Sequence, residues 1–139
     1  MSLPIDFRET LVCDDIRRED NGKAIIVGVY SGDIIASSFP SDMRVSFWLQ
    51  GRPTQQINEK QQMKLELRLL YQDETPGTKV DIDAMIEPSG TVPEGASVVL
   101  VLSSVPIHLE KPCKLLLSIQ DNEQKWITLA EKRVFQGQP

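Results

Sequence analysis

The chain has 139 residues, a formal net charge of −5 and a pI near 4.9. Its length is typical of one domain, so we expect a single domain over residues 1–139 with one hydrophobic core. With 40% hydrophobic and 25% charged residues it resembles a soluble globular protein, and no apolar run is long enough to span a bilayer. The acidic charge and scattered Lys and Arg argue against nucleic acid as a partner, because phosphate binding requires clustered basic residues.

The first seven residues lack the basic stretch and apolar block of a secretory signal, so a cytoplasmic location is expected. Cys13 and Cys113 lie far apart in the sequence. Their spacing fits neither a dense disulfide framework nor a CxxC pair, and reduced, half-buried thiols are expected.

The N-terminal part of the chain indicates a long β-hairpin. Strand-like runs at 10–18 and 23–30 flank an Asn21-Gly22 turn, and Asn-Gly is a strong hairpin signal because both residues tolerate positive φ. A further β run is expected at 33–36. A helical turn over 11–19 is the alternative, but it lacks a cap and is followed by β-branched residues.

Three runs in the middle of the chain alternate between apolar and polar residues with the period of a half-buried strand, namely 44–50, 63–71 and 80–86. Turn residues flank each run. The segment 50–62 is rich in Gln, Asn and Pro, so a flexible loop is expected there.

The C-terminal part predicts further strands. Residues 98–102 are apolar on both faces, which suits a central strand or an edge that meets another subunit, and a kink near Pro106 is expected to end or bend this strand. Runs at 115–119 and 126–135 flank a polar turn at 121–124 and predict a C-terminal hairpin.

These runs predict an all-β fold, an antiparallel two-sheet β-sandwich of about seven to eight strands. The architecture is expected to be immunoglobulin-like. The chain has Cys13, Trp48 and Cys113 in the order found in immunoglobulin domains, but with different spacing and with Lys111 where those domains carry a tyrosine.

No enzyme motif accompanies this pattern. His108 is the one histidine, and its place in an alternating segment predicts a solvent-exposed side chain. Neither cysteine lies near it in sequence, so a nucleophile-histidine pair is not indicated. Phosphate-binding and dinucleotide-binding glycine motifs are absent, and no cofactor is expected.

One dense group of charges stands out, the candidate cluster Asp14, Asp15, Arg17, Arg18 and Glu19. On a strand, Asp14 and Arg18 share a face with Ile16, while the other three share the opposite face. Each face therefore carries opposite charges, which predicts neutralised pairs beside the hairpin turn. If Ile16 points inward, Asp14 and Arg18 flank it at the edge of the core.

A functional interpretation of the cluster stays open beside this structural one. Its carboxylates could bind Ca²⁺ or a polar ligand together with Asp121 and Glu123, or with Asp73 and Glu74, if one end of the fold gathers these loops. Arg17 and Arg18 would repel a cation, and the EF-hand pattern is absent.

The motif Cys13-Asp14-Asp15-Ile16-Arg17-Arg18-Glu19, followed by Gly22-Lys23 and by Gly28-Val29-Tyr30, resembles a family of small uncharacterised bacterial proteins. The resemblance implies no activity and no catalytic residues. It implies that the motif belongs to one structural unit, as the predicted hairpin does.

The leading hypothesis is a non-enzymatic binding or assembly module that acts through a sheet face, an edge strand or loop ends. We expect the chain to bind another protein or to form a homo-oligomer, and we expect it to bind neither nucleic acid nor a membrane. The alternative is a metal- or small-ligand-binding protein, or a hydrolase, centred on Asp14, Asp15, Arg17 and Glu19, with His108 as a further candidate.

Overall fold

The computed structural model describes residues 3–21 and 23–137. Within these residues the chain forms nine strands and no helix. The strands are β1 (Ile5–Arg18), β2 (Ala24–Val29), β3 (Ile34–Ala36), β4 (Ser41–Pro53), β5 (Gln61–Tyr71), β6 (Pro76–Ile86), β7 (Val98–Leu109), β8 (Cys113–Gln120) and β9 (Trp126–Gln136). The described residues form nine strands where seven to eight were expected, and β3 lies within the further β run expected at 33–36.

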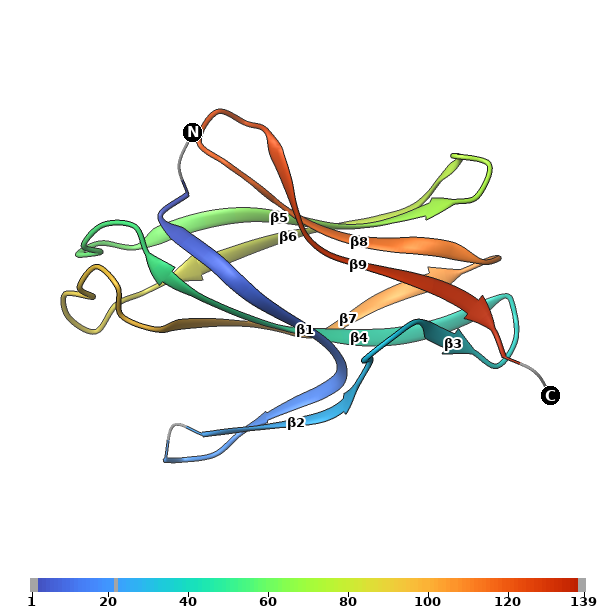
Figure 1. Cartoon of the computed structure of the whole chain (residues 1–139), viewed down its shortest axis with the longest axis horizontal. Helices are drawn as coiled ribbons and strands as arrows, with labels where there is room; N and C mark the ends of the chain where they lie inside the picture. The colour runs from blue at the N-terminus through green and yellow to red at the C-terminus, as the bar shows by residue number, and fades with distance from the viewer. Residues whose placement is uncertain (1–2, 22, 138–139) are drawn as a thin grey trace.

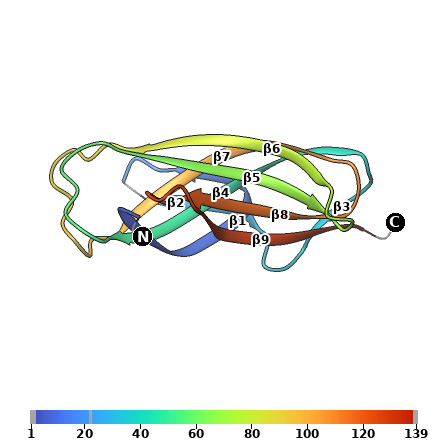
Figure 2. The ribbon, with the colours of Figure 1, turned by 90° about the horizontal axis from the view of Figure 1, so that it is seen from above.

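The strands form two sheets that face each other (Figures 1 and 2). Sheet A has the order β2-β1-β4-β7, and sheet B has the order β3-β9-β8-β5-β6. The predicted two-sheet sandwich is therefore confirmed. Neighbouring strands are antiparallel except β3 and β9, which run parallel at one edge of sheet B. This pair can be parallel because most of the chain, and not a short hairpin, connects its two strands.

The hydrophobic core lies between the sheets. It is built by the alternating apolar residues, among which Phe47 and Leu49 of sheet A and Leu65, Leu67 and Leu117 of sheet B are fully buried. Burial of each such side chain stabilises the fold by roughly 1.5–3 kcal/mol. The apolar residues of the alternating runs in the middle of the chain are thus the residues that form the core.

One local prediction was wrong and a second was wrong in part. Segment 50–62 is not one flexible loop: β4 continues to Pro53, and Ile57 is buried and pairs with Val92 across an isolated bridge. The strand that begins at Val98 was expected to end or bend near Pro106. It does not end there but runs on to Leu109, and its irregularity lies just before the proline, where Ser104 has a φ of +51° and the pairing with β4 shifts. It can contain a proline because β7 is an edge strand, and one side of it forms no ladder hydrogen bonds.

The predicted N-terminal hairpin is confirmed, and the helical alternative for 11–19 was wrong. Strands β1 and β2 pair from Cys13–Val29 to Arg18–Ala24. At the turn, the Glu19 amide donates to the Lys23 carbonyl, and the Asn21 side chain accepts from the Lys23 amide. Gly22 lies outside the described residues.

The far end of this hairpin forms a third layer. We call residues 14–18 of β1 together with 24–29 of β2 the hairpin arm. In Figures 1 and 2, β1 bends and the arm folds back along the outer face of sheet A, on the side away from sheet B. Arg18 and Ala24 of the arm line one hollow of about 130 Å³ with Trp48 of β4 and Val99 of β7. The arm therefore covers part of sheet A.

Candidate functional site

The five charged candidates Asp14, Asp15, Arg17, Arg18 and Glu19 all lie on the arm or directly after it. Their side chains are exposed or partly exposed, while Ile16 between them is only 8% exposed. Ile16 is buried, as the sequence suggested for an inward-pointing residue, but it does not belong to the core cluster between the sheets.

One of the predicted charge pairs is present. The Arg17 Nε atom lies 3.4 Å from Asp15 Oδ2, and Asp15 Oδ1 accepts a 2.9 Å hydrogen bond from the amide of Ile16. Both charged side chains are substantially solvated, so this ion pair contributes little to stability. The Asp15–Arg17 pair is therefore a surface ion pair near the end of β1.

The other predicted pair, Asp14 with Arg18, does not form. Asp14 Oδ1 accepts a 2.5 Å hydrogen bond from the hydroxyl of Tyr30, which follows β2 directly. Gly28 lies against the other carboxylate oxygen, where a Cβ atom would be 2.3 Å from Asp14 Oδ2, and its φ is +67°. Glycine is thus required both for the backbone conformation and for the space. Asp14, Gly28 and Tyr30 form the base of the arm.

A buried serine ties this base to two more strands. Ser46 is buried, although the alternation predicted an exposed position. The pairing of β4 with β7 shifts here, so that Ser46 stands opposite both Ser103 and Ser104 of β7. Its hydroxyl accepts from the Ser104 amide at 2.9 Å and donates to the Asp14 carbonyl at 3.4 Å. One side chain therefore connects β1, β4 and β7.

Burial changes the acidity of two groups here. It raises the pKa of Tyr30 to about 12, with a further contribution from the hydrogen bond to Asp14. Burial also raises the pKa of the Cys13 thiol, and Asp14 and Asp15 add to this effect. A thiol that stays protonated is a poor nucleophile, so Cys13 has the character of a structural residue.

The structure does not gather the remaining candidates around the arm. Asp73 and Glu74 follow β5, and Asp121 and Glu123 follow β8, which runs antiparallel to β5, so the two pairs lie at opposite ends of sheet B. Among residues 3–21 and 23–137, no group of three His, Cys, Asp or Glu side chains could hold a metal ion.

His108 has carboxylate partners of its own. Its Nδ1 lies 2.6 Å from Asp42 Oδ1 and its Nε2 lies 2.6 Å from Glu110 Oε1. These hydrogen bonds, first that to Asp42 and then that to Glu110, raise the pKa of the histidine. The side chain is 44% exposed, so it is accessible to water as expected, but it is held between two acids.

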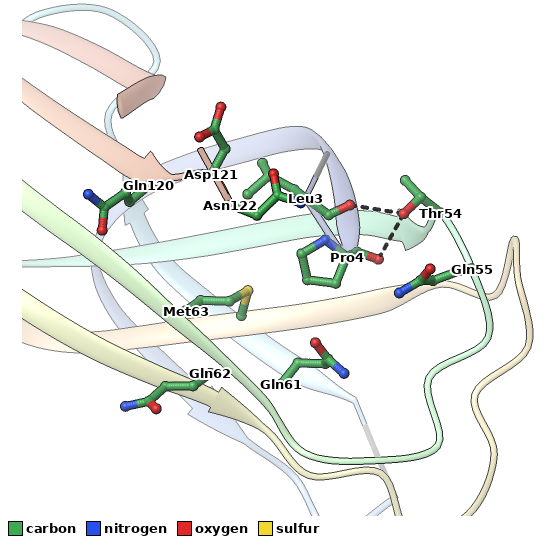
Figure 3. A pocket seen from close by; sticks show the side chains of 10 residues that line it. All are labelled: Leu3, Pro4, Thr54, Gln55, Gln61, Gln62, Met63, Gln120, Asp121 and Asn122. Atoms are coloured by element: carbon green, nitrogen blue, oxygen red, sulfur yellow. Dashed lines mark hydrogen bonds between the residues drawn. The ribbon is translucent and has the colours of Figure 1, made fainter. Parts of the chain in front are cut away.

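A polar hollow of about 270 Å³ lies where the turn after β8 meets the start of the chain (Figure 3). The Asp121 carboxylate on its wall points away from Gln61 and Met63 (Figure 3), and its Oδ1 accepts from the amides of Glu123 and Lys125. Its Oδ2 is buried with no hydrogen-bond partner among the described residues. The carboxylate therefore serves the turn, and uncharged amide side chains such as Gln55 and Gln61 face the hollow.

The outward side of the arm is apolar. Ile25, Val27 and Val29 of β2 are 47%, 41% and 45% exposed, and they share one side of the strand. Strand β2 is also an edge of sheet A, so one side of its backbone has no ladder partner in this sheet. Their alternation was visible in the sequence, but the sequence could not show that this side faces outward.

A family model described as a family of unknown function, DUF6941, matches residues 9–130. The chain belongs to this family. The DUF6941 match includes the whole arm, its base and most of both sheets, so the arm is part of the family's domain. No curated protein matches the chain. The described part of this DUF6941 chain has no helix that could cross a membrane.

Proposed function

We propose that the chain is a non-enzymatic binding and assembly module, which binds a β-strand of another polypeptide at the free edge of β2. The observation that carries this proposal is the unprotected edge of the hairpin arm. An edge strand presents unpaired N–H and C=O groups, and an added strand gains main-chain hydrogen bonds and apolar side-chain contacts.

The other three edges support this choice, because each has protection that β2 lacks. Strand β3 has only three residues, β7 contains Pro106, and β6 begins with Pro76 and carries Lys79, Asp81 and Asp83. Short length, proline and charge are the means by which natural edges avoid pairing. None of the six residues of β2 is charged or proline.

A selection from a library of displayed extended peptides tests the proposal. Wild-type protein is expected to bind β-forming peptides, and Val27→Lys is expected to lose them because the substitution places a charge on the apolar side of the edge. Met85→Lys is the matched control, since Met85 is also an exposed apolar residue on an edge strand. Equal binding by wild type and Val27→Lys, or no binder to wild type, would overturn the proposal.

The same proposal includes an immunoglobulin-like arrangement. Strands β1, β4 and β7 correspond in order to A, B and E of an immunoglobulin domain, and β5, β6, β8 and β9 correspond to C, C′, F and G. A bacterial origin is supported by the sequence resemblance. A cytoplasmic location is supported by Cys13 and Cys113, which are buried free thiols in different sheets.

A further inference from the structure

We infer that the strand bound at this edge is β2 of a second copy of the chain, paired antiparallel across a two-fold axis. The inference rests on the proposed function and names its partner. In the resulting dimer, the sheets A of the two copies join edge to edge through β2. A two-fold interface uses the same surface on both copies, so that surface has to be complementary to itself.

Charge favours self-pairing of β2 over self-pairing of another edge. Like charges directly opposite each other destabilise a strand pair. Residues 24–29 carry no charge, so no register of β2 against itself creates such a conflict within the strand. In β6, a two-fold centred on Asp81 would place that carboxylate opposite its own copy. Among the strands described, β2 is the edge of more than three residues that is free of both charge and proline.

Symmetry and side-chain pattern together define the register. In an antiparallel pair, opposite residues project to the same face, so a two-fold axis perpendicular to the sheet passes through a residue and not between two residues. An axis at Val27 places Ile25 opposite Val29 of the second copy and Val27 opposite itself. All three exposed apolar side chains then pair with apolar side chains.

The other side of β2, which carries Ile26 and Gly28, fits the same register. With the axis at Val27, Ile26 lies opposite Gly28 of the second copy, so a large side chain meets a residue without one. An axis at Ile26 would instead place Val29 opposite Lys23 of the second copy, and an axis at Gly28 would place Ile25 opposite Ser31. Both alternatives leave an apolar residue against a polar one.

Sedimentation velocity over about a hundredfold range of concentration tests the partner, because association follows mass action. Wild type and the control Met85→Lys are expected to form a dimer as concentration rises, whereas Val27→Lys is expected to remain a monomer. Circular dichroism and thermal unfolding of Val27→Lys check that the substitution acts on the edge and not on the fold.

Cysteine cross-linking under mild oxidation tests the register. Opposite residues in an antiparallel pair have Cα atoms about 4.5–5.5 Å apart, within reach of a disulfide. Val27→Cys is expected to form a covalent dimer alone. Ile25→Cys and Val29→Cys are expected to do so efficiently only when the two variants are mixed. Wild type is the control, because its own cysteines are buried.

The outcomes separate this inference from the proposed function. A wild type that stays monomeric and a Val27→Cys that does not cross-link would overturn the second copy as partner, while peptide binding blocked by Val27→Lys would still support strand binding at this edge. Cross-linking of Ile25→Cys alone, as efficient as that of Val27→Cys, would contradict the axis at Val27. Concentration-dependent dimers with the mixed-variant pattern support the inference.

Discussion

Tyr30 donates a 2.5 Å hydrogen bond to the Asp14 carboxylate, and this contact joins the end of β2 to the bend in β1. The hairpin arm starts at this bend. The contact connects the charged motif of the sequence with the exposed apolar edge, since Asp14 belongs to the first and Tyr30 follows the second. The motif thus supports the surface that we propose to bind.

Gly28→Ala is expected to destabilise the fold. The substitution combines a positive φ with a Cβ atom 2.3 Å from Asp14 Oδ2, and a strained backbone position of this kind costs about 1–3 kcal/mol. Urea denaturation measures the loss. Gly32→Ala is the control, because no atom lies within 4 Å of its added Cβ. An equal effect of both substitutions would show that Gly28 has no special role.

Tyr30→Phe is expected to change the alkaline part of the stability profile. The folded-state pKa of Tyr30 is raised from 10.0 to about 12, so folding favours the neutral phenol. This contribution is complete below the unfolded-state pKa and is lost as the pH rises through about 12. Wild type should therefore lose stability more steeply than Tyr30→Phe as the pH rises from 10 to about 12. Parallel profiles by chemical denaturation would contradict the assigned contact.

Ser46→Ala should cost about 1 kcal/mol, the typical net value of a hydrogen bond, because the Ser104 amide loses its acceptor. Differential scanning calorimetry would detect this as a lower melting temperature. Ser103→Ala, at an exposed position beside Ser104, is expected to leave the melting temperature unchanged. A neutral Ser46→Ala would mean that water replaces the hydroxyl.

His108 should make stability depend on pH near neutrality. Asp42 and Glu110 raise its pKa above 6.5, so the imidazolium is favoured in the folded state. The stabilisation is fully present below the unfolded-state pKa and is lost as the pH rises through the raised folded-state pKa. Titration of the imidazole by NMR measures that pKa, and Asp42→Asn should lower it. An Asp42→Asn protein with the wild-type pKa would count against the contact.

The sequence predicted the sheets better than their edges. The alternation in 63–71 and 80–86 indicates strands with one buried side, and the structure has β5 and β6 at these positions. Alternation does not report which strands lie at an edge, so the strand at 98–102 could be predicted as central or edge, and only the topology places it at the edge of sheet A. For the same reason, Pro106 was predicted to end or bend this strand, although an edge strand can contain a proline.

The candidate cluster was predicted in part. The Asp15–Arg17 pair follows from positions two apart on one strand, and the structure contains it. The partner of Asp14 could not be predicted in this way, because Tyr30 is brought to it by the hairpin and by the space that Gly28 leaves. Likewise, Ser46 was predicted to face water because alternation shows only which side of a strand faces the core, and it cannot show that Ser104 and the backbone of Asp14 contact the other side.

The position of Trp48 beneath the arm gives the molecule an internal optical reporter. The chain has two tryptophans, of which Trp126 is exposed while Trp48 is partly shielded beside Arg18 and Ala24. A Trp126→Phe protein would retain one indole, located where the arm lies on sheet A. The fluorescence emission of Trp48 would shift to longer wavelength when the arm moves away from sheet A, and it would stay constant when only the core between the sheets rearranges. Motion of the hairpin arm could therefore be followed separately from global unfolding.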